Sequence, residues 1–273
     1  ILTGADLTDV SLTGVDLSGR ELMGTILRGA DLTDANLTGV DLSGRDLTGT
    51  LLRGMDLTDK DLTGTILREA DLTDANLTGV DLSGRDLTGT ILRGADLTDA
   101  VLPSGYLSGK NFKYTIFNGV DLSGKDLTGS IFHRANFADA NLENANLTSA
   151  DFTEVDLTKI KNKSLAGAKL FNTSLAYSNL SGVNLSGVIL GETNFWKANL
   201  SGVDFTAVSN ATFGSAFIET NLSDSNFQGV DLSSEGILTA TFKNKAHLIN
   251  LSAVDIIETL FAKSPNKLLI SGE

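Results

Sequence analysis

The 273-residue sequence predicts an all-β solenoid, in which short strands alternate with tight corners along a rod. Three observations lead to this prediction: a large apolar residue at every fifth position, a small residue two places before it, and Gly, Asp or Asn two places after it. The large residues, Leu or Phe, recur without a gap from Leu2 to Leu157. A period of five that is kept this long indicates a repeated structural unit.

The period of five excludes both regular secondary structures. On an α-helix a step of five residues rotates by about 140°, so the large residues would surround the helix and form no buried stripe. In a continuous strand, residues five apart point to opposite faces. The chain must therefore turn once in every unit.

Each position of the unit has a structural reason. A small residue such as Ala30 lies two places before Leu32, so both point to the same inward side of a short strand. In Leu37-Thr38-Gly39 the Gly occupies the position of a type II turn that requires a positive φ, and Asp and Asn tolerate it. Four such units close one square coil, which stacks on the next at about 4.8 Å.

The pattern Ala-Asp/Asn-Leu/Phe at residues 5–9, 35–39 and 135–139 resembles that of the pentapeptide-repeat family. The resemblance implies a right-handed, quadrilateral, parallel β-helix with columns of stacked core residues, Phe among them. Segments 25–50 and 65–90 differ only at one position, and their offset equals two coils. Their side chains are therefore expected to recur on the same faces.

The pattern is interrupted and then ends before the C-terminus. We expect a regular β-helix over 1–157, a basic break or loop over 158–164, and a less regular continuation of the β-helix over 165–242. Residues 243–273 are expected to form a cap or linker, in which a Ser-Ala-Val-Asp capping box opens a short α-helical cap. Because Ile1 already lies inside the pattern, we expect the chain to be one module of a larger protein.

Composition argues against an enzyme. The chain has no Cys, which removes thiolate metal sites and cysteine nucleophiles, and His133 and His247 lie far apart in no catalytic or metal motif. We therefore expect no catalytic residue, no metal and no cofactor. The net charge of −13 disfavours direct nucleic-acid binding, and no apolar run is long enough to cross a membrane. A cytoplasmic location is expected, with a secreted effector as the alternative.

Acidic residues are concentrated in the N-terminal part, where residues 1–100 hold 18 acidic and 8 basic side chains. With four units in a coil, outward carboxylates 20 residues apart should form columns on two faces. Such columns would attract a protein partner with a basic surface. The candidate residues of this acidic surface are Glu21, Asp41, Asp61 and Asp81 in one column and Asp16, Asp56 and Asp96, alternating with Asn36 and Asn76, in another.

Six cations occupy the inward position that is otherwise small. A buried, unpaired cation is costly, so we expect the stems to cross a corner and the charged heads to reach the neighbouring carboxylates. The alternative is a basic stripe within the acidic face. These residues are Arg20, Arg45, Lys60, Arg85, Lys110 and Lys125.

Three functions are compatible with these features. The first is a non-catalytic interaction or scaffolding solenoid. The family resemblance also implies an acidic DNA mimic that binds a type II topoisomerase such as gyrase, or the β-helix module of a secreted bacterial effector such as a ubiquitin ligase. The catalytic cysteine of such a ligase cannot lie in this Cys-free chain.

Overall fold

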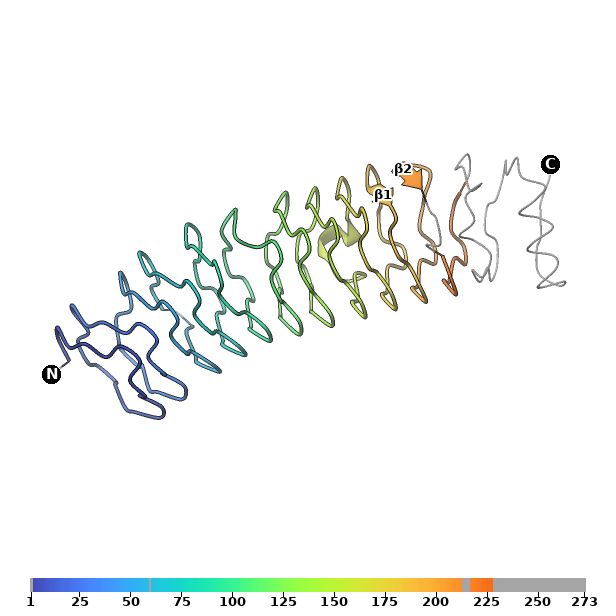
Figure 1. Cartoon of the computed structure of the whole chain (residues 1–273). Helices are drawn as coiled ribbons and strands as arrows, with labels where there is room; N and C mark the ends of the chain where they lie inside the picture. Colours follow the sequence, from blue (N-terminus) through green and yellow to red (C-terminus); the bar gives the residue numbers. More distant parts are fainter. Residues whose placement is uncertain (1, 59, 213–216, 228–273) are drawn as a thin grey trace, which may run out of the picture.

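The computed structural model describes residues 2–58, 60–212 and 217–227, which wind into a rod of stacked coils (Figure 1). Backbone hydrogen bonds join each coil to the next in the parallel sense. The N–H of Leu7 donates to the carbonyl of Ile26 at 2.9 Å, and the N–H of Ile26 donates to Ala5 at 3.0 Å. Parallel bridges such as Asp6 to Ile26 place residues 20 apart in register, so each coil contains four five-residue sides. This confirms the predicted β-helix.

The strands are short because each side turns a corner after a few residues. Most pairings are single parallel bridges between coils. The longer strands of the described part are β1 (Ile189–Gly191) and β2 (Ser209–Thr212), which pair in parallel with a register shift (Figure 1). The shift lies where the five-residue spacing slips in the sequence.

Most corners are closed by a hydrogen bond from the fourth residue of the turn back to the carbonyl of the large residue. The N–H of Val40 donates to the carbonyl of Leu37 at 3.0 Å, and Gly39 between them has a φ of +70°. Asp34 takes the same role with a φ of +57°. A positive φ at the third position is that of a type II turn, as the sequence predicts.

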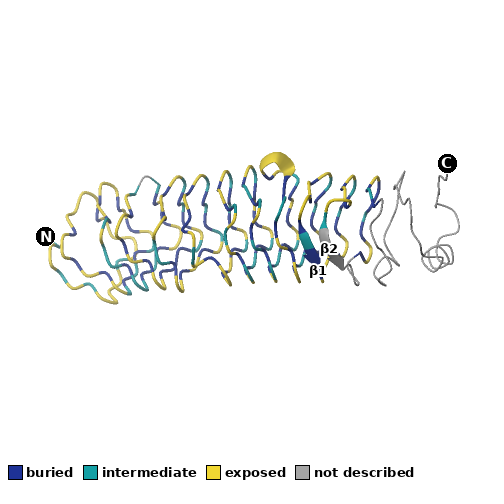
Figure 2. Ribbon diagram, turned by 90° about the horizontal axis from the view of Figure 1, so that it is seen from above, coloured by how far each residue is buried: buried dark blue, intermediate teal, exposed yellow. Residues whose placement is uncertain are grey.

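The large residues of all four sides are buried in the interior, with small residues such as Ala30 and Ala70 between them. Figure 2 marks the buried positions along the coils. From Phe112 to Phe152, Phe replaces Leu on two neighbouring sides. Phe112 stacks on Phe132 at 5.3 Å between ring centroids, and Phe117 stacks on Phe137 at 5.0 Å. The predicted phenylalanine columns are therefore confirmed, and each such pair stabilises the rod by about 0.5–1.5 kcal/mol beyond simple burial.

The basic insert adds residues to one corner of one coil. Its residues Lys161–Lys163 form the exposed 3-10 turn η1, which projects from the edge of the rod (Figure 2). The coil offset is 23 across the insert, as in the bridge from Asn146 to Lys169, and returns to 20 between Lys169 and Ile189. Because the extra residues bulge outward, the columns continue in register beyond them.

Two expectations from the sequence remain: the structure of the C-terminal part of the chain and the absence of a membrane-spanning segment. The last part of the continued β-helix, residues 228–242, and the predicted helical cap or linker, residues 243–273, lie outside the described residues. Across residues 2–58, 60–212 and 217–227, no helix has both the length and the apolar character that a bilayer crossing requires.

Candidate partner-binding surface

Each side of the coil carries an outward column, because residues that directly precede the large core residues lie 20 positions apart and stack. We number the sides faces 1 to 4 in chain order, so face 3 is opposite face 1 and face 4 adjoins face 1. The outward residues of the first coils are Glu21, Asp41, Asp61 and Asp81 on face 1; Asp6, Ile26, Asp46, Ile66 and Asp86 on face 2; Ser11, Asp31, Leu51, Asp71 and Ile91 on face 3; and Asp16, Asn36, Asp56, Asn76 and Asp96 on face 4.

The predicted acidic residues lie on the two adjacent faces 1 and 4. On face 4 the bridges from Asp16 to Asn36 and from Asn76 to Asp96 show the predicted alternation of carboxylates and amides. Six of the seven acidic side chains are exposed, and Asp96 is half-buried. The structure thus brings the predicted carboxylates together on one half of the rod's circumference.

These carboxylates are held in place by the corners that follow them. Oδ1 of Asp81 accepts the backbone N–H of Ser83 at 2.7 Å, and Oδ1 of Asp41 accepts that of Ser43 at 2.8 Å. The hydroxyl and the N–H of Ser83 hold the pKa of Asp81 below its ordinary value of 3.8, and Ser43 does the same for Asp41. Asp41 and Asp81 are therefore ionised at neutral pH, and their carboxylates are fixed in orientation before any partner binds.

The two acidic faces differ in charge density. On face 4, Nδ2 of Asn36 donates to Oδ1 of Asp16 at 3.0 Å, so an amide separates successive carboxylates. On face 1 the carboxylates follow one another directly. The hydrogen bonds from Thr63 hold the pKa of Asp61 low, although the neighbouring charge of Asp41 acts to raise it. Face 1 is therefore the more strongly negative column.

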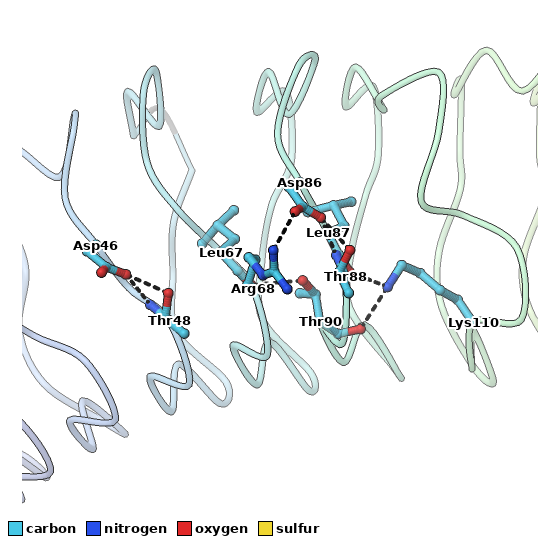
Figure 3. Close-up of polar contacts among 9 residues, drawn as sticks. All are labelled: Asp46, Thr48, Leu67, Arg68, Asp86, Leu87, Thr88, Thr90 and Lys110. Atoms are coloured by element: carbon cyan, nitrogen blue, oxygen red, sulfur yellow. Dashed lines mark hydrogen bonds and ion pairs between the residues drawn. The ribbon is translucent and has the colours of Figure 1, made fainter.

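On faces 2 and 3, Asp46, Asp71 and Asp86 pair with arginines of the chain. Nε of Arg53 lies 2.6 Å from Oδ2 of Asp71 on face 3. On face 2, Nη1 of Arg68 lies 3.4 Å from Oδ2 of Asp86, as Figure 3 shows. Within the described part of the chain, none of the seven predicted acidic residues forms a salt bridge. The carboxylates of faces 1 and 4 thus lack a direct ion pair within the described residues, although Arg45 and Arg85 lie near enough to help lower the pKa of Asp41 and Asp81.

The expectation that the inward cations reach neighbouring carboxylates is wrong. Nζ of Lys110 donates to the carbonyls of Leu87 at 2.6 Å and Thr90 at 3.1 Å (Figure 3). In other coils a hydroxyl takes the equivalent carbonyl, as Oγ1 of Thr90 does at Leu67 at 2.8 Å. That carbonyl has a second lone pair after accepting the corner N–H, so an ammonium or guanidinium can replace the hydroxyl.

Four more of these cations make the same contact. They are half-buried, whereas Arg20 is exposed and does not share the contact. Because their heads bind the main chain, they form no basic stripe across the acidic faces. The donor and acceptor pairs are Arg45 to Leu22, Lys60 to Leu37, Arg85 to Leu62 and Lys125 to Leu102.

A column of bulky residues at the corner that follows face 3 is not among the predicted site residues. They occupy the position of positive φ, which Gly or Asp fills in the first coils. In the sequence, this column is recognisable because the residues at one corner of successive coils are no longer Gly, Asp or Asn. The residues are Tyr114, Arg134, Glu154, Tyr177, Lys197 and Glu219, with φ between +54° and +63°.

Aromatic rings on this corner contact cations. The Nζ of Lys197 lies 4.9 Å from the ring of Trp196, and Tyr177 contacts Trp196 with their centroids 4.9 Å apart. Nearer the middle of the rod, Cζ of Arg93 lies 5.5 Å from the ring of Tyr114. Exposed Tyr, Trp and Arg side chains are typical of protein interfaces.

The family model for pentapeptide repeats matches the chain in eight copies, within residues 1–84, 95–161 and 164–207. The chain belongs to the pentapeptide-repeat family. This confirms the resemblance seen in its five-residue pattern, and the coils described above are those repeats. Comparison with curated proteins finds no significant match.

Solved structures of other pentapeptide-repeat proteins resemble the chain. HetL, a regulator of heterocyst differentiation from the cyanobacterium Nostoc, is 30% identical over 84% of this chain and 90% of that one, with a TM-score of 0.42. Full-length QnrB1, a plasmid-mediated fluoroquinolone resistance protein, is 19% identical over 92% and 96%, with a TM-score of 0.26. A pentapeptide-repeat protein from the Arabidopsis thaliana thylakoid lumen is 25% identical over 51% and 78%, with a TM-score of 0.21.

Proposed function

We propose that this pentapeptide-repeat chain is a non-catalytic scaffold that binds a basic protein surface through faces 1 and 4. One observation carries the proposal: seven carboxylates on these adjacent faces form no salt bridge within the described residues, whereas Asp46, Asp71 and Asp86 on faces 2 and 3 pair with arginines. Charge that is not used within the fold is available for a partner.

The rigidity of the columns favours this role. A partner that binds flexible side chains must order them, at a cost of about 0.5–1.5 kcal/mol for each long side chain. Here the hydrogen bonds from the following Ser or Thr already fix the carboxylates, as at Asp61 and Asp81. The field of ordered charges would steer a basic partner toward the rod, and salt would weaken the attraction because exposed charges are screened within about 8 Å at physiological ionic strength.

A charge-matched pair of variants tests the proposal. The face-1 variant carries Asp61→Asn and Asp81→Asn, and the control carries Asp46→Asn and Asp86→Asn on face 2. Asn retains the corner hydrogen bond, as Oδ1 of Asn36 does for the N–H of Thr38 at 3.0 Å, so both variants should fold.

The measurement is the affinity for a fluorescent oligolysine peptide as a function of salt concentration. We expect the face-1 variant to lose severalfold more affinity than the face-2 control, because Asp61 and Asp81 form no salt bridge within the described residues whereas Asp46 and Asp86 pair with Arg28 and Arg68. Equal losses would show that bulk charge alone is responsible, and the proposal would fail.

A DNA mimic that occupies the DNA site of a type II topoisomerase is the second candidate. It is favoured by the carboxylates that follow one another on face 1, about 4.8 Å apart. Together with face 4 this gives one charge per roughly 3 Å, against one per about 1.7 Å of axis in duplex DNA. The resemblance in charge is therefore partial.

A gyrase supercoiling assay distinguishes the mimic from the general scaffold. Inhibition by the native chain that the face-1 variant loses would support the mimic, and no inhibition at all would remove it. The third hypothesis, a module of a secreted effector, has no specific observation in its favour among the described residues.

A further inference from the structure

Face 3 carries a cluster of cations in the middle of this acidic chain. Three successive coils contribute the segments 91–94, 111–114 and 131–134, which contain no Asp or Glu. The residues that we call the cationic patch are Ile91, Arg93, Lys113, Tyr114, His133 and Arg134.

The backbone places the three segments side by side. The N–H of Gly94 donates to the carbonyl of Lys113 at 2.9 Å, and the N–H of Tyr114 donates to that of His133 at 3.1 Å. The guanidinium of Arg93 lies 5.5 Å from the centre of the Tyr114 ring, which lies 6.1 Å from the His133 ring. The side chains of the patch therefore form one continuous surface.

Arg93 has lost the ion-pair partner that its repeat provides elsewhere. Arg53 on the same face pairs with Asp71, 18 residues later. The residue at the equivalent position for Arg93 is Asn111, which is neutral. Arg134 pairs with Glu154 of the next coil, so the arginine and lysine of the patch that form no salt bridge within the described residues are Arg93 and Lys113.

Tyr114 and Arg134 occupy an unfavourable backbone position; Arg134 pairs there with Glu154 of the next coil, whereas the ring of Tyr114 stays exposed. Tyr114 has a φ of +63° and Arg134 a φ of +56°, at a corner where Gly54 and Gly94 stand in earlier coils. A bulky residue in this left-handed region costs about 1–2 kcal/mol, which Gly avoids. Tyr114 also remains 44% exposed. An exposed ring held at an unfavourable backbone position points to a role in contact with another molecule.

We propose that the cationic patch binds a short, acidic, extended segment of a partner protein. Carboxylates of the segment pair with Arg93 and Lys113, and an apolar side chain packs on Tyr114. Three coils span two steps of about 4.8 Å, the length of roughly three residues in an extended chain. The site is thus sized for a short linear motif.

A peptide fits this patch better than a nucleic acid. Nucleic-acid affinity comes from many phosphate contacts, whereas the patch offers cations over only three coils and the chain as a whole repels polyanions. Face 1 lies on the opposite side, and its charges are screened over distances beyond about 8 Å at physiological salt. The chain could thus hold an acidic partner on face 3 and a basic one on face 1, which extends the proposed scaffold to two partners.

Fluorescence polarisation with the full chain tests the inference. The probe is a fluorescein-labelled peptide of sequence Gly-Asp-Phe-Glu-Asp-Gly, and its analogue with Lys in place of the acidic residues is the charge control. The patch variant carries Arg93→Gln and Lys113→Gln. The matched variant carries Arg28→Gln and Arg68→Gln, which remove the same charge from cations paired on face 2.

We expect the patch variant to bind the acidic peptide about tenfold more weakly than the native chain, since two exposed ion pairs are lost. The matched variant should lose less than twofold. Tyr114→Gly should also weaken binding while leaving the melting temperature unchanged or higher, because Gly suits the positive φ. A purely structural role of Tyr114 would instead lower the melting temperature.

Three results would overturn the inference: no binding of the acidic peptide to the native chain, equal losses in the patch and matched variants, or tighter binding of a single-stranded oligothymidylate than of the peptide. The last result would identify a nucleic-acid surface in place of a peptide site.

Discussion

Replacing Lys110 by Met should lower the free energy of unfolding by about 2 kcal/mol. Its ammonium donates to the carbonyls of Leu87 and Thr90 at 2.6 and 3.1 Å, and Met keeps the stem without the donor. A hydrogen bond to a charged group contributes about 1.5–3 kcal/mol. Burial of the ammonium offsets part of this, and it lowers the pKa of Lys110 although the charge of Asp86 opposes the shift.

The variant Lys110→Thr separates the role of the head from that of the stem. In the coils directly before and after, Thr90 and Ser130 donate their hydroxyls to the equivalent carbonyls of Leu67 and Leu107, at 2.8 and 2.7 Å. A Thr at position 110 should therefore take the carbonyl of Leu87. We expect its stability to lie within about 1 kcal/mol of the native chain, since one hydrogen bond replaces another.

Urea denaturation followed by circular dichroism measures these differences, with calorimetry as a check on the transition. The reasoning is refuted if Lys110→Met is as stable as the native chain, because the carbonyl contacts would then contribute nothing. It is also refuted if Lys110→Thr is as unstable as Lys110→Met. In that case packing of the long stem would be the stabilising element.

Three further outcomes follow from the same structure. The hydroxyl and N–H of Ser83 lower the pKa of Asp81 in the folded chain below 3.8. The ionised Asp81 therefore stabilises the fold fully above pH 3.8, and this stabilisation is lost as the pH falls through the pKa of the folded chain. Asp81→Asn should flatten the acid limb of a plot of melting temperature against pH. Asp71→Ala should cost about 1–3 kcal/mol in urea denaturation, because Asp71 is 4% exposed and accepts from Arg53 at 2.6 Å; a neutral result would contradict the importance of this pair. Phe132→Ala should cost about 3–5 kcal/mol, because it empties the middle of a stacked column, and a loss near 1 kcal/mol would show that the coils collapse into the space.

Much of the fold could be predicted because the pentapeptide unit is local. The spacing of Leu32 and Leu37 requires a corner between them, and Gly39 or Asp34 supplies the positive φ that the corner needs. A coil of four units then fixes which residues stack, since the offset of 20 follows from the unit length. The acidic columns of faces 1 and 4 could be predicted for the same reason.

The amino-acid sequence by itself thus determined the coil, the core and the columns, because these depend on residues within one repeat. Only the tertiary structure decided where long side chains end. The ammonium of Lys110 binds a carbonyl 23 residues away rather than a carboxylate. Arg53 reaches Asp71, whereas Arg93 forms no salt bridge among the described residues. A flexible side chain binds whichever acceptor the stacked neighbouring coil presents within reach. That choice exists only once the coils are stacked, so no local pattern encodes it.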